Sequence, residues 1–347
     1  MDPFDETLLD DAEALEKFDP ALRWLAESGA RVRKEAAAAA EADQLLADTP
    51  RPRAIVAAGA DARLLRAVLE PWCPVPFVAW PGPSLPGWAG ALDLVAVLAP
   101  RGGDPGVAST VVEAVRRGCG LLVAAPRHSL IAEHAASRAT TLLPTQSDDG
   151  LAVAVVTLQA LHQLGLGPEI NAESVAAALD EVALACSPFS EIGSNPGKDM
   201  AIALADSLPL VWGGSVLAAR AGRRVAEALR RTSGRAALAA DAAHLLPVIT
   251  AAGSRDVFAD PFVSTTLELD DEARPILVVL DDGTVDPAVR EQRGHLLHTV
   301  EEHDVRVHQL QAIEGPDVAR YASLLAAGTY AATYLAMGLG RPATHLA

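Results

Sequence analysis

Two stretches decide the fold of this chain: residues 54–69, AIVAAGADARLLRAVL, and residues 210–229, LVWGGSVLAARAGRRVAEAL. Each has an apolar run of strand length, a glycine turn and an amphipathic segment of helix length, which predicts a strand, a turn and a helix. The turns differ, because Asp61 follows the first glycine whereas Gly213–Gly214 are followed by Ser215. A helix N-terminus offers N–H groups and a positive dipole end to an anion, and a carboxylate at the N-cap occupies those donors. The sequence therefore predicts an open anion site only at the second turn.

The same alternation runs along the chain. Expected strands cover residues 53–58, 75–80, 92–99, 121–125, 140–143, 210–212, 275–280 and 305–310. One expected helix follows the first glycine turn and ends at residue 69. The other expected helices cover residues 105–117, 129–137, 151–164, 171–185, 198–208, 216–231, 286–302 and 316–337. This pattern is typical of parallel sheets with helices on both faces, so the predicted class is α/β. Expected domains are an N-terminal helical arm (1–50), a first unit (51–165) and a second unit with a C-terminal helix (166–347).

Composition excludes several functions. The 347 residues carry a formal net charge of −17, which argues against nucleic acid or an anionic membrane surface as a partner. Three cysteines, Cys73, Cys119 and Cys186, have no C-x-x-C spacing, as expected in a reducing compartment. The acidic N-terminus is no signal peptide and no apolar run reaches about 18 residues, which predicts a cytoplasmic protein. No nucleotide-binding motif is present and no cofactor is expected.

One set of residues resembles a known family. Asn195–Ala201 (NPGKDMA) is followed by Pro209–Gly213 (PLVWG), an arginine-bearing helix and a Tyr-Leu-Ala sequence ending at Ala336. This order resembles the double sugar-isomerase (SIS) domain proteins, above all the bifunctional phosphoglucose/phosphomannose isomerases of archaea and actinobacteria, with the actinobacterial TobH-like branch. The resemblance covers residue 51 to the C-terminus. It implies two SIS-like units, a phosphorylated sugar as ligand, a role in carbohydrate metabolism and a homodimer whose active sites use both subunits.

The family's phosphate loop has no clear counterpart here. The resemblance implies a loop rich in serine and threonine after the strand at 92–99, where this chain has PRGGDPG at 100–106. Asp104 followed by Pro105 is typical of an N-cap and the first residue of a helix. Arg101 with the amides of Gly102 and Gly103 remains an alternative phosphate contact beside the reading as a simple capped turn.

The family's proton-transfer residues are also displaced. The resemblance implies a glutamate that moves a proton between C1 and C2 and histidines that assist ring opening, but no acid lies between Glu227 and Asp241. A base must reach hydrogen-bond distance of the proton it takes. Glu227 could serve if the register shifts by one helical turn, or it is a surface residue paired with neighbouring arginines. His244 is the counterpart of one family histidine, and the other falls at residue 326 or 327, both alanine.

The remaining motifs are weaker evidence for a function. Leu277–Thr284 (LVVLDDGT) is similar to the D-x-D-G-T of haloacid dehalogenase-type phosphatases, but its aspartates are adjacent, so it predicts a turn. Four histidines between residues 295 and 308 lack a converging ligand set, and no metal is expected. Lys198 is a candidate ligand or interface contact, with a surface lysine as the alternative. The predicted ligand-binding residues are Gly213, Gly214, Ser215, Arg223, Lys198, Arg101, Gly102 and Gly103, and the catalytic candidates are His244 and Glu227.

Three functions follow from these residues. The first is a sugar-phosphate-binding or partner-binding protein of isomerase ancestry whose catalytic motifs are degenerate. The second is an active glucose-6-phosphate/mannose-6-phosphate aldose–ketose isomerase that uses rearranged residues. The third is a structural dimeric partner without a ligand.

Overall fold

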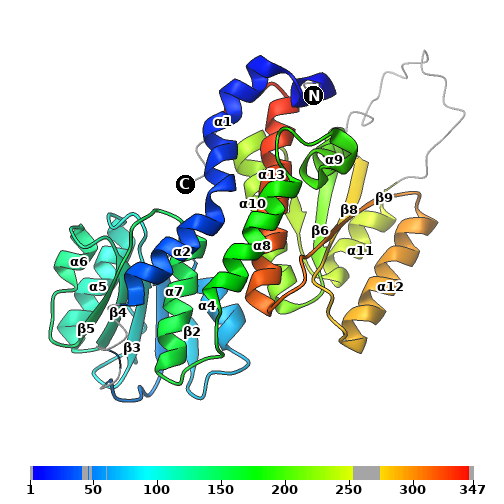
Figure 1. Ribbon diagram of the computed structural model, residues 1–347. Coiled ribbons are helices and arrows are strands. Elements are labelled where there is room, and N and C mark those ends of the chain that lie inside the picture. Colours follow the sequence, from blue (N-terminus) through cyan, green and yellow to red (C-terminus); the bar gives the residue numbers. More distant parts are fainter. Residues whose placement is uncertain (1–2, 41–45, 47–48, 60, 253–273, 344–347) are drawn as a thin grey trace, which may run out of the picture. The chain divides into compact units, whose positions relative to one another are not determined.

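The computed structural model describes residues 3–40, 46, 49–59, 61–252 and 274–343. The chain divides into two compact units, here called the first unit (27–180) and the second unit (Met1–Ala26 with Glu181–Leu346). Each contains one parallel sheet, which confirms the predicted α/β class with two sheets and flanking helices (Figure 1). Parts of the expected arm lie outside the described residues, namely Asp2 and residues 41–45 and 47–48. Ala60 of the first glycine turn also lies outside them.

The first unit is built on a five-stranded parallel sheet of order β2-β1-β3-β4-β5. Its strands are β1 (Ile55–Gly59), β2 (Phe77–Ala79), β3 (Leu94–Leu98), β4 (Gly120–Ala125) and β5 (Thr140–Pro144). Its helices are α2 (Ser28–Ala39), α4 (Ala62–Leu69), α5 (Pro105–Arg117), α6 (Leu130–His134) and α7 (Gly150–Gln163), and α8 (Ala172–Ala185) follows them. The central strands β1, β3 and β4 are apolar and almost wholly buried, as expected for a sheet covered on both faces.

The second unit has a four-stranded parallel sheet of order β7-β6-β8-β9. Its strands are β6 (Ser207–Gly213), β7 (Leu238–Ala239), β8 (Arg274–Asp281) and β9 (Arg306–Gln311). Its helices are α1 (Ala12–Ala26), α9 (Pro196–Leu204), α10 (Val216–Ser233), α11 (Ala242–Thr250), α12 (Pro287–Glu302) and α13 (Asp317–Gly338), with short 3-10 turns η1 (Glu6–Leu9) and η3 (Ile192–Ser194).

The helices of the second unit cover opposite faces of its sheet. Leu210 and Trp212 of β6 pack with residues of α11 and α12 on one face. The other face belongs to α10, since a Cβ at Gly222 would contact Val211 and Leu280. α13 packs on α10, where Gly328 admits the side chain of Val225.

The N-terminal helices contribute to both units. α1 and η1 contact α13 in the second unit, whereas α2 contacts α7 in the first. The ring of Phe4 fills the space beside Gly338, where a Cβ would collide with it, and the Asp5 amide donates to the Gly338 carbonyl at 2.8 Å. Residues 3–26 are therefore part of the packing of the second unit.

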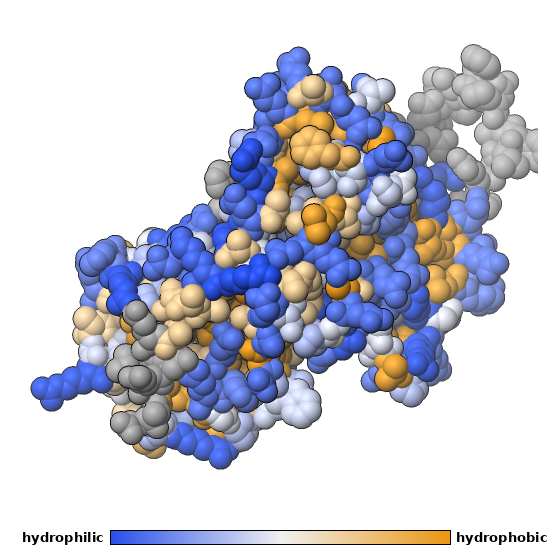
Figure 2. Space-filling model, in the orientation of Figure 1, coloured by the Kyte–Doolittle hydropathy of each residue, from blue (hydrophilic) through white to orange (hydrophobic). Residues whose placement is uncertain are grey.

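Three elements depart from the predictions. β7 and α11 were not expected, and α9 ends at Leu204, four residues earlier than predicted, because β6 already begins at Ser207, opposite Arg274 of β8. The surface in Figure 2 is mostly hydrophilic with apolar residues scattered through it. In the described ranges no helix is long and apolar enough to cross a membrane.

Candidate anion-binding site

The sheet of the second unit has a topological switch point between β6 and β8. After β6 the chain enters α10 on one face and continues to β7, whereas after β8 it enters α12 on the other face and continues to β9. In open α/β sheets, connections that diverge in this way leave a crevice at the carboxyl ends of the strands, which is where ligands bind. The predicted second turn lies at this edge.

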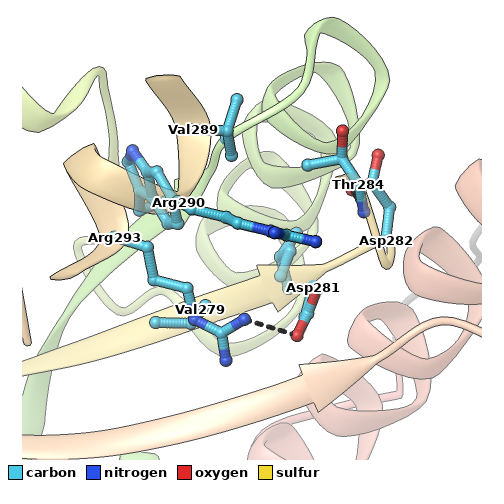
Figure 3. Close-up of a pocket in the computed structure, with 10 residues that line it drawn as sticks. Val279, Asp281, Asp282, Thr284, Val289, Arg290 and Arg293 are labelled. Atoms are coloured by element: carbon cyan, nitrogen blue, oxygen red, sulfur yellow. Dashed lines mark hydrogen bonds and ion pairs between the residues drawn. The ribbon is translucent and has the colours of Figure 1, made fainter. Parts of the chain in front are cut away.

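A small pocket occupies this place (Figure 3). It lies between Trp212 and Val279 of the strands, the Asp281–Thr284 turn, and Val289, Arg290 and Arg293 of α12. Its volume of about 20 Å³ is enough for one or two water molecules. A single charged group could therefore enter it, and a whole sugar could not.

The Gly213–Ser215 turn is closed by an acid, so the prediction that it stands open is wrong. The Ser215 hydroxyl caps α10 by accepting from the Ala218 amide at 3.0 Å, and it donates to the Asp282 carboxylate. The two glycines admit parts of the chain itself: a Cβ at Gly214 would collide with Val289, and one at Gly213 with the Ala218 backbone. Sequence reasoning missed this contact because it joins residues 67 positions apart.

Both aspartates of the LVVLDDGT turn are held by partners, as expected of a turn. Asp281 accepts from the Arg293 guanidinium at 2.7 Å, the Gln309 amide at 3.1 Å and the Gly283 backbone at 3.0 Å. Besides Ser215, Asp282 accepts from the Thr284 amide at 3.2 Å. The two carboxylates therefore fix the shape of the pocket wall.

Arg290 is different from its neighbour Arg293. Within the part of the chain that the structure describes, no carboxylate lies within ion-pair distance of Arg290, whereas Arg293 is bound to Asp281. Figure 3 shows the Arg290 side chain reaching across the pocket towards the Asp281–Asp282 turn. Arg290 was not among the residues predicted from the sequence.

In the first unit the corresponding switch point lies between β1 and β3, and the chain fills it. Asp61 is buried but makes no side-chain cap on α4, contrary to prediction; a Cβ at Gly150, the first residue of α7, would collide with its carboxylate. Asp104 does cap α5, accepting from the Val107 amide at 2.8 Å, as predicted. Gly102, with φ of +66°, packs on Ser129, and its amide donates to the Ala99 carbonyl at 2.9 Å.

These contacts change the alternative phosphate site at Arg101–Gly103. The amide of Gly102 is already used, so it cannot donate to a phosphate as proposed from the sequence. Gly103 and Arg101 are exposed beside it. Only a side-chain contact from Arg101 and the Gly103 amide remain possible here.

Lys198 is a structural contact and leaves no donor for a ligand. It is wholly buried, and its ammonium group contacts Asp10 Oδ1 at 2.5 Å and the carbonyls of Pro188 at 2.9 Å and Ser190 at 3.2 Å. An ammonium group has three N–H donors, and these three acceptors use them all. Both sequence interpretations, ligand contact and surface lysine, are thereby corrected.

The two catalytic candidates lie on different helices of the second unit. Glu227 is exposed on α10 and pairs with Arg224 at 3.2 Å, whereas His244 is exposed in the first turn of α11. Arg223 is also exposed, 4.0 Å from Asp241. Since α10 and α11 cover opposite faces of the sheet, none of these side chains joins the pocket beside β8.

Comparisons with known proteins agree with the two-sheet α/β fold described above. Residues 193–346 match the family model of the bacterial phospho-glucose isomerase C-terminal SIS domain. No curated protein matches the chain. Among solved structures, tagatose-6-phosphate ketose/aldose isomerase from Escherichia coli is similar, with 16% identity, coverage of 96% of each chain and a TM-score of 0.64.

Two further structures extend the comparison. The C-terminal domain of glucosamine-fructose-6-phosphate aminotransferase from Francisella tularensis has 11% identity, covers 91% of this chain and 95% of its own, and has a TM-score of 0.62. A glucose-6-phosphate isomerase like protein from Thermus thermophilus has 16% identity, coverage of 96% and 94%, and a TM-score of 0.55. At such identities the likeness concerns the fold, and together with the match of residues 193–346 it places this chain among the SIS-fold proteins, as the resemblance predicted.

Proposed function

We propose that this protein binds a phosphorylated sugar and does not isomerise it. The binding half of the proposal is supported by the match to a phosphoglucose isomerase SIS domain and by structural neighbours that include phosphosugar isomerases. The observation that carries the second half is the separation of Glu227 and His244 on opposite faces of one sheet.

Proton transfer between C1 and C2 needs a base within hydrogen-bond distance of the carbon-bound proton. Glu227 is eleven residues beyond the first residue of α10, which at 1.5 Å per residue places it about 17 Å along the helix from the carboxyl edge of the sheet. His244 begins α11 on the other face. Glu227 is also paired with Arg224 at 3.2 Å, and among the described residues no hydrogen bond or ion pair joins it to His244.

The hydroxyl cradle of the family also lacks a replacement in the first unit. The turn after β3 is a capped glycine turn whose Gly102 amide is used internally, and Asp61 and Asp104 place carboxylates near the two turns at this edge. A dianionic phosphate would meet these two carboxylates there, and the hydroxyl of Ser129 beside Gly102 already caps α6. We therefore place ligand binding in the second unit.

Two alternatives follow from the same residues. An active glucose-6-phosphate/mannose-6-phosphate isomerase would use Glu227 and His244 as rearranged catalytic residues, and a purely structural dimeric partner would bind no sugar phosphate. We also propose that the protein is a homodimer, which the family resemblance supports. On the same resemblance we propose that it belongs to the actinobacterial TobH-like branch and acts in carbohydrate metabolism.

The test combines turnover with binding. The full chain is incubated with fructose 6-phosphate and assayed for glucose 6-phosphate and mannose 6-phosphate, with an active phosphoglucose isomerase as positive control. Binding of the same sugar phosphates is measured by calorimetry and by thermal shift. We expect binding without turnover.

Variants separate the alternatives. H244A and E227Q are compared with E70Q, which removes a surface glutamate paired with Arg66. Turnover that is lost in H244A and E227Q but kept in E70Q would establish the active isomerase and refute the proposal. Absence of binding to every sugar phosphate would leave the structural partner.

A further inference from the structure

We propose that Arg290 holds the anionic group of the ligand in the pocket of the second unit, an assignment that rests on the proposed sugar-phosphate binding. The ligand group is a phosphate monoester, and the sugar lies outside the pocket. Four observations lead to this site: the divergence of α10 and α12, the different residues of the two equivalent helices, the partners of the surrounding charges, and the size of the pocket.

The two units carry equivalent helices with different residues. α5 and α12 both follow the strand beside the switch point, and both begin with an aspartate N-cap and a proline, Asp104–Pro105 and Asp286–Pro287. Three residues after the proline stands Ala108 in α5 and Arg290 in α12. Six residues after it stands Val111 in α5 and Arg293 in α12. Ala108 and Val111 are buried in the apolar core of the first unit, so of these two equivalent helices only α12 carries arginines at these positions.

Of these two arginines, only Arg290 is available. Arg293 is fixed by Asp281 at 2.7 Å and by Gln309 at 2.9 Å, whereas Arg290 has no carboxylate partner among the described residues and reaches across the pocket (Figure 3). A guanidinium forms short charge-assisted hydrogen bonds to phosphate oxygens, often two at once. Arg290 can therefore bind a phosphate without breaking an existing ion pair.

The neighbouring acids set the strength of this site. Asp281 is neutralised by Arg293, but Asp282 is held by a hydroxyl and a backbone amide, so its charge acts on any anion in the pocket. Removal of this charge with the same side-chain shape should strengthen anion binding. Asn at position 282 can keep both contacts, because its amide oxygen accepts from Thr284 and its NH₂ donates to Ser215.

The pocket volume limits what enters. About 20 Å³ admits one or two water-sized groups, which fits phosphate oxygens displacing water and excludes a sugar ring. Sugars of different shape should then bind with similar affinity, because the shared phosphate supplies most of the contact. Fructose 6-phosphate and inorganic phosphate are therefore suitable probes.

The experiment is calorimetric titration of the full chain with each probe at low ionic strength, where the pairing is least screened. R290Q should weaken binding of both probes about tenfold or more, since a hydrogen bond to a charged group is lost. R290K should retain part of the affinity, and D282N should bind both probes several times more tightly. R116Q removes an exposed arginine of the first unit that pairs with Glu113, and it should match the wild type. Arg290 is exposed, so R290Q should keep the wild-type melting temperature.

The outcomes of the titrations distinguish the role of Arg290 from the proposed function. If fructose 6-phosphate binds and R290Q behaves like R116Q, the role of Arg290 is overturned while the proposed function stands. If fructose 6-phosphate does not bind but inorganic phosphate binds through Arg290, the proposed function fails and the anion site remains. If neither probe binds the wild type, both are overturned.

Discussion

Lys198 links the N-terminal segment to the body of the second unit, and K198M tests that link. The ammonium group is wholly buried and contacts Asp10 Oδ1 and the carbonyls of Pro188 and Ser190 at 2.5 to 3.2 Å. Methionine fills similar space but donates no hydrogen bond. The substitution therefore removes three contacts while leaving the packing volume nearly unchanged.

The magnitude follows from these contacts. A net hydrogen bond to a charged group contributes about 1.5–3 kcal/mol, and a carbonyl left without a partner costs about 1–3 kcal/mol. The Asp10 side chain is 59% exposed, so its half of the ion pair adds little. Pro188 and Ser190 are half-buried and can regain water in part. We expect the free energy of unfolding of the second unit to fall by about 2–3 kcal/mol.

The assay is urea unfolding with hydrogen exchange followed by mass spectrometry. In K198M, amides of residues 3–26 should exchange faster than in the wild type, because their tie to α9 is lost. D10N should have a smaller effect, since the buried ammonium keeps its two carbonyls. K17M, which breaks an exposed Lys17–Glu13 pair on α1, is the matched control and should be unchanged. Equal unfolding curves and equal exchange of residues 3–26 in K198M and K17M would refute the reasoning.

Three further predictions follow from other contacts. G338A should destabilise the second unit by about 1–3 kcal/mol in urea unfolding, because the new Cβ collides with the Phe4 ring, and the truncation F4A should remove this penalty in the double variant. Burial raises the pKa of Cys186 to about 12, so at neutral pH iodoacetamide should modify the half-buried Cys73 first and Cys186 only in urea; equal rates in the native protein would contradict this. Hydrogen bonds from two arginines lower the pKa of Glu113 from 4.5 to about 2, so its stabilisation is present above pH 4.5 and is lost as the pH falls towards 2. The unfolding free energy of E113Q should therefore decline less steeply over that range, and parallel curves for E113Q and wild type would count against it.

The helices that the sequence located well carry their own end signals. α5 has the predicted bounds because Asp104 and Pro105 start it and Gly118, with φ of +72°, ends it. β7 and α11 were missed for different reasons, although Asp241 stands at the N-cap of α11. A two-residue strand has no periodicity to detect, and Pro247 inside α11 argues against a helix although the fold accommodates it.

The candidate site was less predictable, because its decisive contacts join distant residues. Nothing local to Ser215 indicates that Asp282 will meet its hydroxyl, and nothing local to Lys198 indicates the carboxylate of Asp10, 188 positions away. Arg290 was detectable in principle. Alignment of the two Asp-Pro helix starts would have shown an alanine in one copy and an arginine in the other.

The discontinuity of the second unit has a consequence for the order of folding during synthesis. Residues 27–180 form a unit from one continuous stretch, but Asp10 must wait for Lys198. At about 5–20 residues per second, the 188 intervening positions take roughly 10–40 s to emerge. The helix α13 is synthesised later still, so until then the ribosome-bound chain exposes the apolar face of α1, with Phe18, Leu22 and Leu25, that the finished protein covers.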